Sequence, residues 1–112
     1  MSVLAVDIGG TKLAAGVVDA DGKMLERGEV PTLAHEGLEP VLERIVGLGR
    51  DLLARAAAQK EPVQRIGIGC AGPVNLKAGK VFNPPNLPGW SEVSLVRHIE
   101  SAFGLPAVLE ND

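Results

Sequence analysis

The stretch Asp7-Ile8-Gly9-Gly10-Thr11-Lys12 decides the fold of this chain, because it joins two short apolar runs through a very tight turn. The runs cover residues 3–6 and 13–18, which are rich in small and β-branched residues and have the length of strands. Two strands connected by so few residues must be antiparallel. The sequence therefore predicts an opening β-hairpin with a carboxylate near the end of its first strand and two glycines at its tip.

The glycine turn has two interpretations on these residues alone. Glycines tolerate positive φ and allow close approach, so the backbone N–H groups at the tip could converge on a phosphate. Thr11 would then add a hydroxyl donor, and Asp7 could hold a hydrated Mg²⁺ beside the phosphates. The loop has neither the G-x-x-x-x-G-K-[ST] nor the G-x-G-x-x-G pattern, and no helix dipole would assist it. Alternatively, Gly9 and Gly10 serve only an ordinary tight hairpin.

The composition is that of one small globular domain. The 112 residues are 46% hydrophobic and 22% charged, which is ordinary, whereas aromatic residues make up only 3%. The core must therefore be aliphatic. The formal net charge is −3 and no basic cluster occurs, so the positive surface expected of a nucleic-acid-binding protein is missing. We expect no nucleic-acid partner.

Cysteine content and hydropathy indicate a cytoplasmic protein. Cys70 is the only cysteine, which excludes an internal disulfide and suits a reducing compartment. A small buried hydrophobe is a simpler role for it than a nucleophile. The N-terminus lacks the basic residues of a signal sequence, and Asp7 interrupts its apolar run. No stretch reaches the ~20 apolar residues that cross a membrane, so we expect no membrane partner.

The middle of the chain changes from strand-like to helix-like patterns. Asp21-Gly22 is a hairpin signal, and residues 24–30 supply a third strand that a proline closes. Between residues 39 and 60 the apolar side chains recur at three- and four-residue steps, which predicts a helix. Gly47 and Gly49 weaken this helix, or else allow close packing against the sheet.

A second half with its own helix completes the sheet. The further predicted elements are a fourth strand (64–70), a small hairpin with its tip at 77–80, a stiff proline-rich loop (83–90) and a fifth strand (107–110). Ser91 is the predicted N-cap of a second helix, which Gly104 ends. The order β-β-β-α-β-α-β gives an α/β fold, a mixed five-stranded sheet with helices packed on it. Asp7, Gly72 and Asn111-Asp112 should then gather at one sheet edge, where ligands bind.

At this point the chain resembles the ROK family of bacterial sugar kinases and repressors, and especially its glucokinase-like members. The matching segments are Asp7-Ile8-Gly9-Gly10-Thr11-Lys12, Gly67-Ile68-Gly69-Cys70-Ala71-Gly72-Pro73-Val74-Asn75, Asn86-Leu87-Pro88-Gly89-Trp90, and Phe103-Gly104-Leu105-Pro106 leading to Glu110-Asn111-Asp112. They are distributed in the family's order over nearly the whole chain, from residue 7 to residue 112. The resemblance implies a ribonuclease H-like domain of the actin-like ATPase superfamily.

The resemblance also implies a set of roles. The residues implied to surround the ATP phosphates are Gly9, Gly10, Thr11 and Lys12, with Asp7 near the Mg²⁺. The residues implied to contact the sugar are Gly72, Asn86, Asn111 and Asp112. Asp112 is further implied to be the general base for the attacking hydroxyl, since phosphoryl transfer needs an oriented nucleophile. On the residues alone, Lys12 is equally a solvated strand-end lysine, and Asn86 can serve a turn.

The chain also departs from the family. Its kinases are considerably longer two-domain proteins, so we expect residues 1–112 to be a single N-terminal lobe that is inactive alone. The absent half would carry the adenine pocket, further sugar ligands and often a zinc site; we expect no zinc ligands in this chain, and a homo-oligomer at full length. Glucose is the preferred acceptor, with N-acetylglucosamine, N-acetylmannosamine and fructose as alternatives. A sugar-sensing regulator without its DNA-binding module and a non-catalytic nucleotide-binding module are the rival hypotheses.

Overall fold

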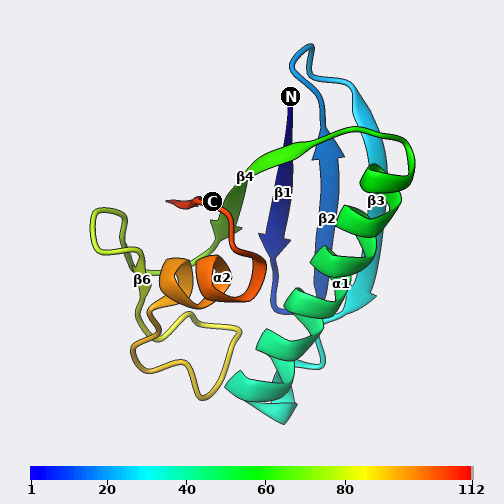
Figure 1. The fold of residues 1–112 in the computed structure, drawn as a ribbon. Helices are drawn as coiled ribbons and strands as arrows, with labels where there is room; N and C mark the ends of the chain where they lie inside the picture. Colours follow the sequence, from blue (N-terminus) through cyan, green and yellow to red (C-terminus); the bar gives the residue numbers. More distant parts are fainter. Residues whose placement is uncertain (112) are drawn as a thin grey trace.

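The structure, a computed structural model, describes residues 1–111, and for Asn111 it describes the backbone only. The strands of the main sheet are β1 (Ser2–Ile8), β2 (Lys12–Val18), β3 (Met24–Pro31), β4 (Val63–Cys70) and β7 (Ala107–Asn111). They lie in the order β3-β2-β1-β4-β7 (Figure 1). β1, β2 and β3 are antiparallel neighbours, whereas β4 and β7 run parallel to β1. The predicted α/β fold with a mixed five-stranded sheet is confirmed.

Two helices cover one face of this sheet (Figure 1). α1 (Leu38–Ala58) packs across the three antiparallel strands, and α2 (Leu95–Phe103) packs on β7 and on α1. The short 3-10 helix η1 (Ala34–Glu36) precedes α1. The strand residues beneath the helices are buried and apolar: Leu4, Val6, Ile8, Leu13, Ala15, Val17, Ile66, Ile68 and Leu109. The core is therefore a mainly aliphatic layer between the sheet and the two helices, as the low aromatic content predicts, and the buried Trp90 side chain belongs to the same cluster.

The opposite face of the sheet, which we call the open face, is lined by small residues. In the strand register Ala5 lies between Gly16 and Gly67, and Asp7 lies beside Gly69. Within residues 1–111 both helices lie on the other side, so this face carries no covering helix. A shallow concavity of about 530 Å³ runs along it. The two faces of the sheet thus have different environments, and Asp7 belongs to the exposed one.

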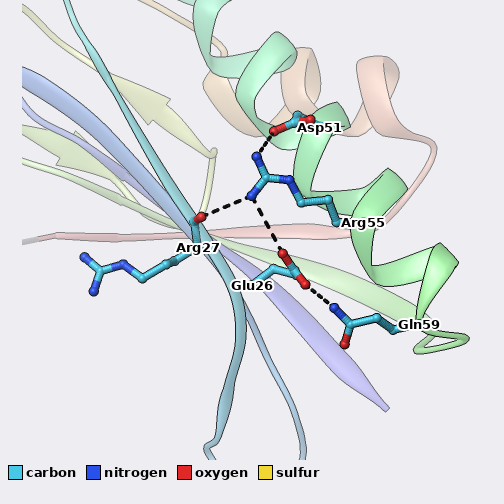
Figure 2. Close-up of polar contacts among 5 residues, drawn as sticks. All are labelled: Glu26, Arg27, Asp51, Arg55 and Gln59. Carbon is cyan, nitrogen blue, oxygen red and sulfur yellow. Dashed lines mark hydrogen bonds and ion pairs between the residues drawn. The ribbon is translucent and has the colours of Figure 1, made fainter.

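The C-terminal half of α1 is tied to the edge strand β3 by a group of polar side chains (Figure 2). The guanidinium of Arg55 lies 2.7 Å from Asp51 on its own helix, donates to the Arg27 carbonyl at 3.4 Å, and lies 3.7 Å from Glu26. Gln59 donates a further hydrogen bond to Glu26. Arg55 and Asp51 are about half exposed, so the aliphatic core beneath contributes far more to this packing than these pairs do.

The predicted N-cap of the second helix is wrong. α2 begins at Leu95, and Ser94 occupies its N-cap position without a side-chain capping bond. The reason is tertiary, because Val93 and Val81 exchange two backbone hydrogen bonds of 2.9 Å in an isolated bridge. An extended Val93 cannot belong to the first turn of a helix that Ser91 would cap. A pairing with a distant segment has overridden the local signal.

Other boundaries differ by a few residues. α1 ends at Ala58 rather than at residue 60, because Lys60 adopts a left-handed φ of 60°. Pro31 lies inside β3 instead of after it, which an edge strand tolerates because the missing N–H needs no partner. The small predicted hairpin is present as β5 (Val74–Asn75) and β6 (Lys80–Val81). Over residues 1–111, neither helix combines the length and the apolar character that crossing a membrane requires.

Candidate functional site

The glycine turn, residues 9–11, joins β1 to β2 at the edge where the parallel strands end. β1 and β2 pair in register up to Ile8 and Leu13, and the Gly9 N–H donates to the Lys12 carbonyl at 3.1 Å to close the turn. The hairpin predicted from the sequence is confirmed. Gly10 and Thr11 lie beyond this closing bond, at the tip.

Two carbonyls of the turn, those of Gly9 and Thr11, are bound to Thr32, which is fully buried just after β3. The Thr32 hydroxyl donates to the Gly9 carbonyl at 2.6 Å, and the Thr32 N–H donates to the Thr11 carbonyl at 2.9 Å. Within residues 1–111, the N–H groups of Gly10 and Thr11 have no hydrogen-bond partner. The Gly9 and Thr11 carbonyls are therefore directed at Thr32, whereas the two N–H groups remain available to an anion.

The proline-rich loop 83–90 packs against two of the predicted site glycines. A Cβ on Gly10 would overlap the Cβ of Asn86, and a Cβ on Gly72 would lie 2.9 Å from the Pro84 Cα. Gly72 also has a φ of 103°, a conformation that favours glycine. The loop is closed by the Asn83 N–H, which donates to the Trp90 carbonyl at 2.7 Å. Gly10, Gly72 and Asn86 are thus brought together around one loop.

The ends of three strands form one row at this edge. Ile8, Cys70 and Asn111 are register partners across β1, β4 and β7, and each is the last residue of its strand. The prediction that the ends of the first, fourth and fifth strands gather at one edge is confirmed. Asp112, which the resemblance implies to be the general base, lies outside the described residues.

Asp7 and Lys12 have different surroundings. Asp7 is exposed on the open face, and among the described side chains no cation pairs with it. Lys12 is 65% exposed, and its Nζ lies 3.2 Å from a carboxylate oxygen of Glu29 on β3. That contact is what a solvated strand-end lysine makes, and pairs of this kind contribute little to stability.

No cluster of three or more His, Cys, Asp or Glu side chains suited to a metal occurs in residues 1–111.

Some features of the site are not evident from the sequence. Thr32 belongs to no sequence motif, because its hydroxyl contacts the Gly9 carbonyl in a turn that lies far earlier in the chain. Gly67, Gly69 and Gly72 have the spacing G-x-G-x-x-G, but the first two lie inside β4 and no helix follows directly, so this is not the strand–turn–helix dinucleotide motif. Trp90 is buried, and its indole N–H has no partner among the described residues.

Curated proteins with similar sequences are sugar kinases. A glucokinase from Streptomyces coelicolor is 38% identical over 109 residues, and an N-acetylmannosamine kinase from Shigella flexneri is 37% identical over 112 residues. The alignments cover 97% and 100% of this chain, but only 32% and 36% of the two relatives. The chain therefore spans about a third of the length of the curated relatives it matches.

Solved structures share the fold along nearly the whole chain. A ROK hexokinase from Thermus thermophilus has a TM-score of 0.86 at 36% identity, with 99% of this chain and 35% of that chain covered. A ROK family glucokinase from Streptomyces griseus, in complex with glucose and AMPPNP, has a TM-score of 0.81 at 37% identity, with 99% and 33% covered. A ROK family transcriptional regulator, a homologue of the E. coli MLC protein, has a TM-score of 0.86 at 25% identity, with 99% and 28% covered.

The ROK family model matches residues 3–112, which is nearly all of the chain. Together with the identity to the kinases, this match settles the family. This chain belongs to the ROK family, whose sugar kinases share its α/β, actin-like ATPase fold.

Proposed function

We propose that residues 1–112 are the N-terminal lobe of an ATP-dependent hexose kinase, which transfers the γ-phosphate of ATP to a sugar hydroxyl. The observation that supports this most is the glycine turn, in which the Gly9 and Thr11 carbonyls accept hydrogen bonds from Thr32. Within residues 1–111, the N–H groups of Gly10 and Thr11 have no partner. Donors fixed in advance are what the charged oxygens of a transferring phosphate require. Asn86, a proposed sugar contact, lies directly against this turn.

The remaining proposed roles follow from where the side chains lie. Asp7 is exposed and has no cation partner among the described residues, so its carboxylate is available to hold a hydrated Mg²⁺. When bound, Mg²⁺ supplies charge neutralisation at the phosphates. Lys12 can leave its exposed contact with Glu29 at little cost and move toward a phosphate. The proposed sugar ligands are Gly72, Asn86, Asn111 and Asp112, of which Asp112 would also orient the acceptor hydroxyl and take its proton.

Glucose, phosphorylated to glucose 6-phosphate, is the acceptor we propose. The segments 86–90 and 69–73 resemble glucokinase-like members, and a glucokinase is 38% identical to this chain. An N-acetylmannosamine kinase is 37% identical, so that sugar is the first competitor to test. The two acceptors differ at C2, where N-acetylmannosamine carries an axial acetamido group in place of the equatorial hydroxyl of glucose. A pocket built for one discriminates against the other by the polar groups it leaves unpaired.

A second lobe completes the proposed enzyme. Because the chain spans about a third of its relatives, we assign the adenine pocket and further sugar contacts to a C-terminal lobe outside these residues. Closure of two lobes would exclude water from the transferring phosphate. We propose a homo-oligomer at full length, and a cytoplasmic location, because ATP is the donor and the single cysteine suits a reducing compartment.

The test uses the full-length protein, expressed from the complete coding sequence that contains these residues. ADP release is then measured with glucose, N-acetylmannosamine, N-acetylglucosamine and fructose as acceptors. We expect the highest kcat/KM with glucose. The 112-residue chain, assayed in parallel, is expected to show no turnover, and robust turnover by this chain alone would contradict the two-lobe proposal.

The Asp112→Asn variant separates the kinase from its rivals. In the full-length protein it is expected to abolish phosphoryl transfer while sugar binding, measured by calorimetry, is retained. A sugar-sensing regulator is the second candidate, since a ROK transcriptional regulator shares the fold at 25% identity. Sugar binding without phosphorylation by the wild type would favour it. The formal net charge of −3 does not favour DNA binding by these residues.

A further inference from the structure

We propose that Thr32, held in place by Arg44, is a positioning residue that aims the N–H of Gly10 at the ATP phosphates. The inference rests on the proposed kinase function and assigns a role to two residues that carry no motif. Thr32 would not touch ATP itself. It would act through the peptide bond between Gly9 and Gly10.

Thr32 uses all of its polar groups in hydrogen bonds, although it is completely buried. Its hydroxyl donates to the Gly9 carbonyl at 2.6 Å, its N–H donates to the Thr11 carbonyl at 2.9 Å, and its carbonyl accepts from Arg44 Nη1 at 2.7 Å. A carbonyl can only accept, so the proton of the first bond belongs to the Thr32 hydroxyl. The residue therefore holds the turn at two points and is itself held at a third.

Because a peptide bond is planar, fixing the Gly9 carbonyl also fixes the direction of the Gly10 N–H. The Gly9 carbonyl and the Gly10 N–H belong to one trans peptide, in which the two groups point in opposite directions. When Thr32 holds the carbonyl toward the protein, the Gly10 N–H must point away from it. That N–H has no partner within residues 1–111, so it is a free donor of fixed direction.

Arg44 connects this arrangement to α1. Its guanidinium donates to the Thr32 carbonyl and also pairs with the carboxylate of Glu36 in η1. The Arg44 side chain is 24% exposed, so its charge is partly shielded from water and its position is restricted. Through Arg44, the position of Thr32 depends on the helix that covers the sheet rather than on the loop alone.

The hairpin itself does not need the Thr32 hydroxyl. The Gly9 N–H already closes the turn on the Lys12 carbonyl, and the ladder between β1 and β2 continues from Ile8 back to Val3. The hydroxyl bond adds no strand pairing. Its specific effect is on the direction of one peptide plane, so its loss should impair phosphate binding beyond any loss of stability.

The experiment uses the full-length protein with four variants and separate KM values for ATP and for the sugar. Thr32→Val keeps the shape and removes the hydroxyl, and we expect the KM for ATP to rise about tenfold while the KM for the sugar is unchanged. Thr32→Ser restores a hydroxyl and should restore the KM for ATP. Arg44→Gln should raise the same KM about threefold, the size expected for the loss of a partly exposed charge contact.

Ser2→Ala is the matched control. The Ser2 hydroxyl is also buried and also makes a 2.6 Å bond, to Glu61, but at the opposite end of β1. We expect it to lower the melting temperature and to leave both KM values unchanged. The inference is overturned if Thr32→Val, or Arg44→Gln should the former not fold, leaves the KM for ATP unchanged or raises both KM values equally. A wild type that phosphorylates no hexose would instead refute the proposed function.

Discussion

Gly10 lies so close to Asn86 that a methyl group on the glycine would overlap the asparagine Cβ. The two residues belong to separate segments, the turn between β1 and β2 and the proline-rich loop 83–90. In the proposed enzyme the first segment binds phosphate and the second binds the acceptor sugar. A direct contact at this point means that a side chain added to Gly10 must displace Asn86.

Gly10→Ala should therefore raise the KM for ATP and the KM for the sugar together, each by about tenfold, because Asn86 must move to make room. The φ of Gly10 is outside the left-handed region, so the effect would come from this contact and not from backbone strain. Steady-state kinetics of the full-length protein measure it. Gly67→Ala is the control, since its Cβ would enter open space. A rise in the KM for ATP alone would show that the contact does not couple the two segments.

Gly47 and Gly49 of α1 should respond oppositely to alanine. Both gain helix propensity, about 1 kcal/mol, but only Gly47 has open space for a methyl group. A Cβ on Gly49 would meet the Phe103 ring and approach Leu4, which costs about 1–3 kcal/mol through overpacking. Urea denaturation of the two variants should show Gly47→Ala as the more stable by that amount. Equal stabilities would mean that Phe103 can move aside freely.

Lys12 and Glu29 form an ion pair in which only Lys12 has a proposed role in phosphate binding. Both are exposed, so Lys12→Gln and Glu29→Gln should each change the free energy of unfolding by less than about 1 kcal/mol. If Lys12 stabilises phosphate charge, only its substitution lowers kcat/KM for ATP, and Glu29→Gln leaves it unchanged or raises it. Identical kinetics for the two variants and the wild type would leave Lys12 as a solvated surface residue.

The sequence predicted those parts of the fold that local patterns and chain connectivity determine. Apolar alternation and the glycine turn indicated the opening hairpin, and right-handed crossovers placed the ends of β1, β4 and β7 at one edge. The row of Ile8, Cys70 and Asn111 confirms this. The prediction of these features does not depend on side-chain contacts between distant segments.

The features that the sequence did not predict are contacts between segments far apart in the chain. Ser91 has the chemistry of an N-cap, yet the bridge between Val81 and Val93 delays the helix. Thr32 follows an ordinary strand, and only the folded structure brings its hydroxyl to the Gly9 carbonyl. In both cases a long-range hydrogen bond decides the outcome, and no periodicity or local motif reports it.

We expect the isolated 112-residue chain to self-associate through the open face. Val108 lies on this face beside Gly67, is 59% exposed, and belongs to β7, which is an edge strand of the sheet that the structure describes. Exposed small and apolar residues next to a strand edge that is unpaired in the described sheet favour association, so size-exclusion chromatography of the 112-residue chain should show concentration-dependent dimers or larger species. Val108→Lys should shift the chain toward the monomer. Leu76→Lys, which changes a similarly exposed leucine in the turn between β5 and β6, should not. A monomer at every concentration would show that the small residues of this face are not sufficiently apolar to associate.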